Sequence, residues 1–378
     1  MGEQATTAAA IRATPAADGL RPRLPAALVT EPTTRPAYTP LPEPQLGHLR
    51  RLTDDRGVWE HAKYDEPRTE HGYCTDDNAR ALVVACHHQG ASLDATVVAA
   101  VTLRFVLDAR DGAGGFRNRR RADGVWLDEP RSDDADGRAL WALGTAARSA
   151  PAAWQRDEAA AAFATVQPID SPDLRPHATA VLGAVEMLAV DPAHMPARRV
   201  AMEGAARIAD AASRRDPWIE PRLTYDDARL PEALLAAGGT LRQRSYTDLG
   251  LELLSWLVED QTHEGHFSFT PVGGRVPGGP RPAFDQQPLE AAAMAAACAR
   301  AFSLTAEPAW RALTTRAAGW LLGANDTGAI LYDPDSGGTC DGLAEHGVNL
   351  NRGAESTIAG IAALQAARST YPLVGLAR

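Results

Sequence analysis

The sequence predicts an all-α protein with an (α/α)6 toroid, in which six helical hairpins form an inner and an outer ring. Two observations lead to this prediction. A segment with a polar start and an alanine-rich continuation occurs six times, and a more amphipathic helical segment lies between successive copies. Recurrence of one unit along a chain indicates an architecture built from repeated helix pairs. The spacing of the copies suits one helical hairpin plus a loop of variable length.

The six copies supply the predicted inner helices. They read "TDDNARALVVAC", "SDDADGRALWALG", "RPHATAVLGAVEML", "TYDDARLPEALLAAG", "FDQQPLEAAAMAAAC" and "NRGAESTIAGIAAL", and they begin at Thr75, Ser132, Arg175, Thr224, Phe284 and Asn351. Their apolar residues recur at the i, i+3, i+4, i+7 spacing of a helix. Pro176, Pro231 and Pro288 suit first helical positions, where the missing N–H group does no harm.

The predicted outer helices lie between these copies. They cover 93–110, 153–166, 197–212, 246–260 and 308–322, and a further helix over 42–55 precedes the first copy. We expect this opening helix to close the ring against the last inner helix. An open α-solenoid also alternates two helices. The closed ring is favoured because the polar start of every copy falls at the same helix end and follows a long, aromatic-rich loop.

Composition restricts the classes of function. The chain has 378 residues, a net charge of −10, 45% apolar and 23% charged residues, which is typical of a globular protein. The acidic net charge argues against a nucleic-acid partner, and the one basic run, "RNRRR" from Arg117 to Arg121, is interpreted as a solvated loop. Four cysteines without a CxxC pair predict neither a zinc site nor a disulfide framework.

The ends and the apolar content of the chain lead to predictions about its organisation and location. Residues 1–40 are rich in Pro, Ala and Thr and are predicted to be a disordered tail, and 41–378 to be a single catalytic toroid domain. No signal-peptide pattern and no stretch of about 18 apolar residues is present, so a cytoplasmic protein without a membrane partner is expected.

Charge is concentrated at the starts of the copies. A local explanation is that Thr75 or Asp76, and likewise Asp133, caps its helix. In a toroid, however, all inner helices run parallel and their N-termini surround one mouth. The polar starts would then form one acidic funnel, lined by carboxylates, guanidinium groups, amides and aromatic rings.

Carboxylates beside aromatic rings predict a glycoside hydrolase acting on an oligosaccharide, because hydrolysis requires two carboxyl groups about 5 to 9.5 Å apart. Asp77 and Asp134 are the favoured pair, since they come from adjacent inner helices. The other catalytic candidates are Asp76, Asp133, Asp227 and Glu355. The predicted substrate-binding residues are Arg80, Arg138, Tyr73, His71, Tyr225, Asp226, Asp285, Gln286, Gln287, Asn351, Arg352, Trp126 and Trp59. No metal and no cofactor is predicted, because His61, His71, His177 and His346 lie on four different segments.

Other functions must be weighed against this one. Isoprenoid enzymes hold magnesium through a DDxxD spacing, but the aspartate pairs of the first two copies are not followed by an aspartate at the last position of that motif. Sugar 2-epimerases share the toroid and use paired histidines, for which His177 and His346 are candidates. Polyuronate lyases use Tyr, Arg and Asn, so Tyr225 and Asn351 keep this possibility open. A non-catalytic carbohydrate-binding role is the fourth alternative.

Four of the motifs also resemble a known family. "HGYCTDDNARAL", "LTYDDARLPEALL", "FDQQPLEA" and "NLNRGAESTIA" are similar to a bacterial family of the six-hairpin glycosidase-like superfamily, which occurs alone or attached to glycosyltransferase domains. The likeness covers residues 42–368. It implies inverting hydrolysis with acid and base at the first two inner helices, Asp76 or Asp77 and Asp133 or Asp134. It also suggests a functional link to a glycosyltransferase.

Overall fold

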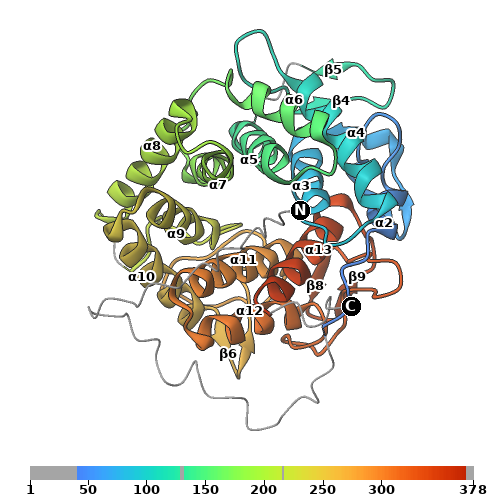
Figure 1. The fold of residues 1–378 in the computed structure, drawn as a ribbon. Helices are drawn as coiled ribbons and strands as arrows, with labels where there is room; N and C mark the ends of the chain where they lie inside the picture. The colour runs from blue at the N-terminus through green and yellow to red at the C-terminus, as the bar shows by residue number, and fades with distance from the viewer. Residues whose placement is uncertain (1–40, 128–131, 215–216, 372–378) are drawn as a thin grey trace, which may run out of the picture.

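The structure is a computed structural model that describes residues 41–127, 132–214 and 217–371. Within these ranges twelve α-helices alternate between two rings (Figure 1). The inner ring comprises α3 (Thr75–Cys86), α5 (Asp133–Ser149), α7 (Leu174–Val190), α9 (Arg229–Leu241), α11 (Pro288–Thr305) and α13 (Ala354–Ser369). The outer ring comprises α2 (Gly47–Arg51), α4 (Leu93–Ala109), α6 (Ala153–Phe163), α8 (Met195–Ala212), α10 (Arg244–Asp260) and α12 (Pro308–Trp320).

The inner ring is closed. Each inner helix packs on the next, and α13 packs on α3, so the last repeat meets the first. The view along the axis in Figure 1 shows the inner helices around a common centre and the outer helices on the periphery. The opening helix α2 contacts α13, as predicted. The (α/α)6 toroid predicted from the repeats is therefore confirmed. The predicted tail, residues 1–40, lies outside the described residues.

Short strands occupy the connections that lead from an outer helix to the next inner helix. The antiparallel pairs are β1 (Ala62–Lys63) with β2 (Glu66–Pro67), β6 (Thr262–His263) with β7 (His266–Phe267), and β8 (Gly342–Ala344) with β9 (Gly347–Asn349). A three-stranded sheet in the order β3 (Tyr73–Cys74), β4 (Arg119–Arg120), β5 (Trp126–Leu127) ties the loop before α3 to the loop before α5. These sheets stiffen the side of the toroid where the inner helices begin.

Two sequence-based expectations about helix ends are wrong. The helix expected over 42–55 is only the five residues of α2, because its flanks bind elsewhere: the Gln45 N–H donates to the Tyr332 hydroxyl at 3.0 Å. Neither Thr75 nor Asp76 caps α3. The N-cap residue is Cys74, whose Sγ accepts from the Asp77 N–H. Ser132 likewise occupies the N-cap of α5 in place of Asp133.

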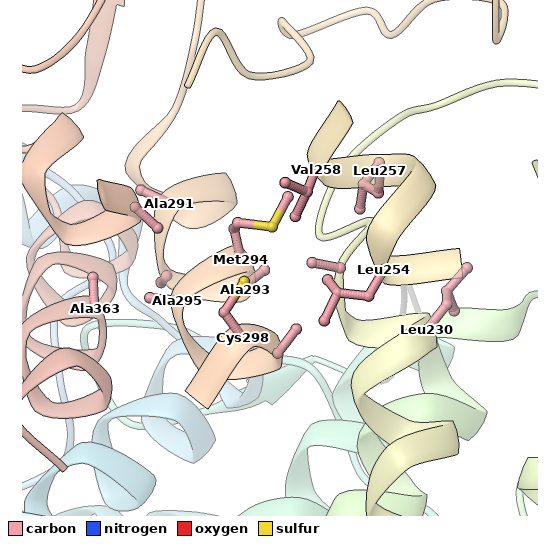
Figure 2. Packing of buried hydrophobic residues seen from close by; sticks show 14 of the residues in the cluster. Leu230, Leu254, Leu257, Val258, Ala291, Ala293, Met294, Ala295, Cys298 and Ala363 are labelled. Atoms are coloured by element: carbon pink, nitrogen blue, oxygen red, sulfur yellow. The ribbon is translucent and has the colours of Figure 1, made fainter. Parts of the chain in front are cut away.

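The core lies between the rings, and α11 illustrates its packing. Figure 2 shows Met294 and Cys298 of α11 directed at Leu254 and Val258 of α10, while small alanines of α11 approach Ala363 of α13. These side chains are buried, and their burial accounts for much of the stability of such a packed interior. Within the described part of the chain, no helix has both the length and the apolar character needed to cross a membrane.

Glycines set the distance between α5 and α7. A Cβ atom on Gly144 would lie 2.0 Å from the carbonyl oxygen of Gly183, and one on Gly183 would lie 2.2 Å from the carbonyl oxygen of Leu140. Real Cβ atoms do not approach backbone oxygens this closely, so the two helices meet backbone to backbone. The glycine content of these two repeats is therefore a packing requirement of the inner ring.

Gly144→Ala is expected to lower the free energy of unfolding by about 2 to 3 kcal/mol, because α5 and α7 must separate within a close-packed interior. Gly319→Ala in α12 is the matched control. Its added Cβ would lie 3.6 Å from the Ala324 Cβ, an ordinary contact, so the better helix propensity of alanine should raise stability by up to about 1 kcal/mol. Urea denaturation of both variants measures the difference. Equal stabilities would contradict the close approach.

Candidate functional site

Carboxylates and guanidinium groups meet where the inner helices begin. We call this group the carboxylate cluster; its members are Asp76, Asp77, Arg80, Asp134, Arg138, Arg175, Glu220, Tyr225, Asp226, Asp227, Arg229, Glu290 and Glu355. They come from α3, α5, α7, α9, α11, α13 and the loop before α9. The convergence expected from six parallel inner helices is therefore present for these residues.

Arg80 joins the first inner helix to the last. Its Nη2 contacts Asp76, Asp77 at 2.8 Å and Glu355 of α13 at 3.0 Å. Arg80 lies one turn after the two aspartates on α3, and side chains three or four residues apart share a helix face. Three carboxylates around one buried guanidinium leave this part of the cluster with an excess of negative charge.

Arg138 joins the first two inner helices to the fourth repeat. Its Nε lies 2.6 Å from Asp76 Oδ1, and its Nη2 lies 3.3 Å from Asp226 Oδ2. Only 3% of Arg138 is exposed, so these pairs are little screened by solvent. Asp76 is thus held between two guanidinium groups, on α3 and on α5.

Asp226 adopts a backbone conformation that its surroundings enforce. Its φ is +52°, in the left-handed region that non-glycine residues rarely adopt. The Asp226 N–H donates to Glu290 Oε1 at 2.6 Å, and Arg229 Nε donates to Asp226 Oδ1 at 3.0 Å. Strained backbone persists where several contacts over-determine it, and such positions concentrate at functional sites.

Arg175 organises the neighbouring part of the cluster. Its Nη1 lies 2.9 Å from both carboxylate oxygens of Glu220, its Nη2 donates to Asp227 Oδ1 at 2.7 Å, and its guanidinium stacks 4.6 Å from the Tyr225 ring. The Tyr225 hydroxyl in turn donates to Asp134 Oδ2. Tyr225 thereby ties the loop before α9 to the start of α5.

The surroundings move the pKa values of these carboxyl groups apart. Burial favours the neutral form of Asp76, but the charges of Arg138 and Arg80 outweigh it, so the pKa of Asp76 is lowered. Burial raises the pKa of Asp134 against the opposing charge of Arg138. Burial also raises the pKa values of Asp77 and Asp227 to about 7. Adjacent carboxyl groups therefore favour opposite protonation states, which is an arrangement suited to acid/base chemistry.

The two neighbouring aspartates at the start of α3, and the two at the start of α5, differ in how exposed they are to solvent. Asp77 is 3% exposed, and it accepts from Arg80 and from the Cys74 thiol. Asp76 and Asp134 are half-buried at the edge of the cluster, while Asp133 is exposed on the first turn of α5. Direct contact with a substrate is therefore open to Asp76 and Asp134 and closed to Asp77. Asp227 is fully buried beneath Tyr225 and Arg175.

Several predicted substrate-binding residues lie elsewhere. Gln286 is fully buried, and it binds the Phe269 N–H and the Trp320 indole, so it supports the loop before α11. Arg352 pairs with Asp65 at 2.8 Å and Asp333 at 3.2 Å, beside α2. The structure does not bring Gln286 or Arg352 into the cluster.

The remaining predicted contacts also have local roles. Asn351 Oδ1 accepts from the Tyr64 N–H, Gln287 is the N-cap residue of α11, and Asp285 is exposed ahead of it. His71 is exposed, with its ring centroid 4.8 Å from that of His61. Gln287 meets the carboxylate cluster through its backbone carbonyl, which accepts from the Glu290 N–H at 3.2 Å, whereas the contacts given above for Asn351 and His71 lie outside the cluster.

Three aromatic residues that were predicted to bind substrate pack against other side chains instead. Trp59 and Tyr73 are buried and stacked, with ring centroids 4.1 Å apart, and Trp126 packs edge-on against Phe105 at 4.9 Å. They form a small apolar group that supports the β3–β4–β5 sheet. Tyr225, which is 38% exposed, is the predicted aromatic residue that contacts the carboxylate cluster, through Asp134.

Four members of the cluster, Arg175, Glu220, Arg229 and Glu290, are not among the predicted catalytic and substrate-binding residues. A signal existed for three of them, and Glu290 stands near the start of the fifth copy. Arg175 is the polar start of the third copy, and Arg229 follows Asp226 at the same three-residue spacing by which Arg80 follows Asp77. Both aspartate–arginine pairs form, at 3.0 and 2.8 Å. Glu220 lies in a loop without any repeat signal, and only its bond to Arg175 identifies it.

One group of described residues has the atoms of a metal site. Single ligand atoms of Glu60, Cys74 and Asp77 lie within 4.8 Å of one another. Glu60 already pairs with Arg119, and the Cys74 thiol donates to Asp77. Burial holds the pKa of Cys74 well above its usual value, which favours the thiol over the thiolate that a metal requires. These contacts explain the group without a metal.

Protonation of Asp227 gives a testable pH dependence. Its folded pKa of about 7 exceeds the unfolded value of about 4, so between these values the native state binds more protons than the unfolded state. Stability contributed by the protonated carboxyl is therefore lost as pH rises from about 4 to 7. Relative to Asp227→Asn, the wild-type protein should lose about 2 to 4 kcal/mol across this window in urea denaturation. A gain over the same window would contradict the assignment.

Comparison with protein-family models and with curated proteins finds no match. Solved structures do match. A sugar epimerase from a ruminal bacterium has a TM-score of 0.66 at 11% identity, covering 85% of this chain and 95% of that chain. The cellobiose 2-epimerase from Spirochaeta thermophila has a TM-score of 0.62 at 12% identity, covering 86% of this chain and 93% of that chain. The cellulase CEL9M of C. cellulolyticum has a TM-score of 0.53 at 10% identity, covering 84% of this chain and 88% of that chain. At this identity the likeness establishes the shared (α/α)6 six-hairpin fold.

Proposed function

We propose that this protein is a carbohydrate-active enzyme that hydrolyses a glycosidic bond at the carboxylate cluster, with Asp134 as general acid and Asp76 as general base. The observation that carries the proposal is the placement of two half-buried carboxyl groups on adjacent inner helices, with Asp76 bound by Arg80 and Arg138 and Asp134 bound by the Tyr225 hydroxyl. These surroundings lower the pKa of Asp76, and burial raises that of Asp134. We propose Asp76 as the base in place of Asp77, which the sequence favoured, because Asp77 is buried and its carboxylate is bound by Arg80 and by the Cys74 thiol.

The proposed reaction has one step. The Asp134 carboxyl gives its proton to the glycosidic oxygen as the bond between that oxygen and the anomeric carbon breaks. The Asp76 carboxylate takes a proton from the water molecule whose oxygen adds to the anomeric carbon from the opposite face. The products are a hydroxyl-bearing leaving sugar and a hemiacetal of inverted configuration. Adjacent helix axes lie about 8 to 10 Å apart, which suits the wider carboxyl separation of inverting enzymes.

The other cluster residues have supporting roles in this proposal. Arg80 and Arg138 keep Asp76 ionised, which a base requires. Tyr225 donates to Asp134 and holds its carboxyl group in position. Asp226, Asp227 and Glu355 bind the guanidinium groups of Arg138, Arg175 and Arg80 and hold them in place. A functional link to a glycosyltransferase and action on a cytoplasmic oligosaccharide remain part of the proposal.

Epimerisation is the second candidate, since the ruminal-bacterium and Spirochaeta thermophila structures described above are sugar epimerases. Paired histidines would serve that reaction as acid and base, but His177 Nε2 bonds to the Ser171 carbonyl, and its side chain lines a small cavity between α7 and α8. His346 is exposed in the turn between β8 and β9. A lyase reaction with Tyr225 as base is disfavoured, because burial raises the pKa of Tyr225 above its usual value.

Product analysis tests the proposal. Purified protein is incubated with defined manno-, gluco-, galacto- and uronic oligosaccharides, and products are followed by mass spectrometry and proton NMR. Products carrying one added water with inverted anomeric configuration support it. An isomer with the same mass as the substrate would identify an epimerase. An unsaturated product one water lighter than the hydrolysis product would identify a lyase. Either result would overturn the hydrolase assignment. Sugar binding without any reaction would make the cluster a recognition site.

A further inference from the structure

A cavity of about 420 Å³ occupies the centre of the toroid beyond the carboxylate cluster. Its lining runs along α3 from Arg80 to the residues that follow the helix, and along α11 from Leu289 to Ser303. It therefore extends toward the mouth where the inner helices end. Asp76 and Asp134 do not line it. Arg80 and Arg229 are the residues that this cavity shares with the cluster.

The walls of the cavity are chemically mixed. Ala292, Ala296 and Ala299 present small side chains from one face of α11, and this is why the centre is not filled. The opposite wall carries the ring of Trp141, with the guanidinium of Arg229 packed 4.8 Å from the ring centroid. An apolar wall with an aromatic ring and a few polar groups is typical of small-molecule sites, and the volume lies in their usual range.

Arg80 has hydrogen-bonding capacity to spare at this cavity. All three of its carboxylate partners contact Nη2, and its Nε and Nη1 have no partner among the described residues. Arg80 is only 6% exposed. A buried donor without a partner is destabilising, so a ligand that supplies oxygen acceptors here would be bound favourably.

Charge selects the class of ligand. The other arginines of the cavity wall are paired: Arg229 and Arg300 lie beside Glu232, and Arg368 beside Glu43. An anion on Arg80 would lie beside the carboxylates that Arg80 already binds, Asp76 and Glu355, and these would repel it. A neutral polyol avoids this repulsion. Its hydroxyl groups can accept from Arg80 and donate to Glu232, while the apolar face of a sugar ring can pack on Trp141.

We propose that this cavity is a second carbohydrate site, which binds a neutral mono- or disaccharide from the mouth opposite the carboxylate cluster. Binding here does not depend on the reaction proposed above, because none of the proposed acid/base residues lines the cavity. Ala296 supplies a test, since a larger side chain at this position narrows the cavity, and neither Asp76 nor Asp134 lines that cavity.

The test follows Trp141 in Asp134→Asn protein, in which turnover is suppressed. The chain has eight tryptophans, and the indole N–H signal of Trp141 is identified by its loss in Trp141→Phe. Titration with glucose, mannose, galactose and maltose to about 10 mM, a concentration matched to weak binding, should shift this signal for at least one sugar. Adding Ala296→Leu should weaken that binding at least tenfold. Ala161→Leu, at an exposed position of α6, should leave it unchanged.

Three results would overturn the second site. One is undiminished binding after Ala296→Leu, another is no shift of the Trp141 signal with any of the four sugars, and the third is a shift caused by acetate or phosphate in place of sugar. Failure of the hydrolase proposal is distinguishable from these results. It is read from product formation by protein with an intact Asp134, and the binding experiment does not use that readout.

Discussion

Asp134→Asn is expected to lower kcat/KM about 10³-fold on whichever oligosaccharide the wild-type protein cleaves, because an amide cannot protonate the leaving oxygen. The side chain is nearly isosteric and still accepts from the Tyr225 hydroxyl, so the site should stay assembled. Asp133→Asn is the matched control, since it makes the same chemical change one residue earlier on the exposed first turn of α5. Its kcat/KM should remain within about threefold of wild type.

The pH profile separates a catalytic acid from a positioning residue. Activity of the wild-type protein should fall at high pH as Asp134, whose pKa is raised, loses its proton. It should fall at low pH as Asp76, whose pKa is lowered, gains one. Asp134→Asn should remove the high-pH limb from its residual activity. A variant that keeps the limb, or one with unchanged turnover, would exclude Asp134 as the acid.

Arg138→Met is expected to cost about 3 kcal/mol in the free energy of unfolding, because removing one partner of a buried ion pair leaves a buried charge behind. Arg138 contacts both Asp76 and Asp226; Arg138 and Asp226 are buried, and Asp76 is half-buried. Methionine retains much of the apolar stem of arginine, so the loss reports on the charge. Urea denaturation at neutral pH measures it.

Arg214→Met is the control for this substitution. Arg214 pairs with Asp210 at 2.7 Å, but both side chains are mostly exposed, and such pairs contribute little. No measurable change in stability is expected. The double variant Arg138→Met with Asp76→Asn should recover part of the loss, since it removes one of the stranded charges. Equal losses in Arg138→Met and Arg214→Met would show that the ion pairs of the cluster do not stabilise the fold.

The sequence by itself determined the fold class and the boundaries of most helices. Helical periodicity is a local property, and six copies of one pattern with six amphipathic segments between them leave few ways to bury every apolar face. The parallel direction of the inner helices then follows from their alternation with the outer ones, and it brings Asp76, Arg80 and Glu355 to the same end of the ring. Opening helix α2 is an exception, because contacts with the distant Tyr332 loop limit its length.

Only the tertiary structure decided which polar residues at the starts of the copies are buried, and which partners they bind. Asp76 and Asp77 are neighbours with similar sequence surroundings, but successive residues point about 100° apart on a helix, so only ring packing determines which one is buried. Gln286 and Arg352 stand at copy starts, yet the loops before α11 and α13 direct them into other contacts. Glu220 has no repeat signal at all. Pairings between residues many positions apart depend on how the loops are placed, and local periodicity carries no information about that placement.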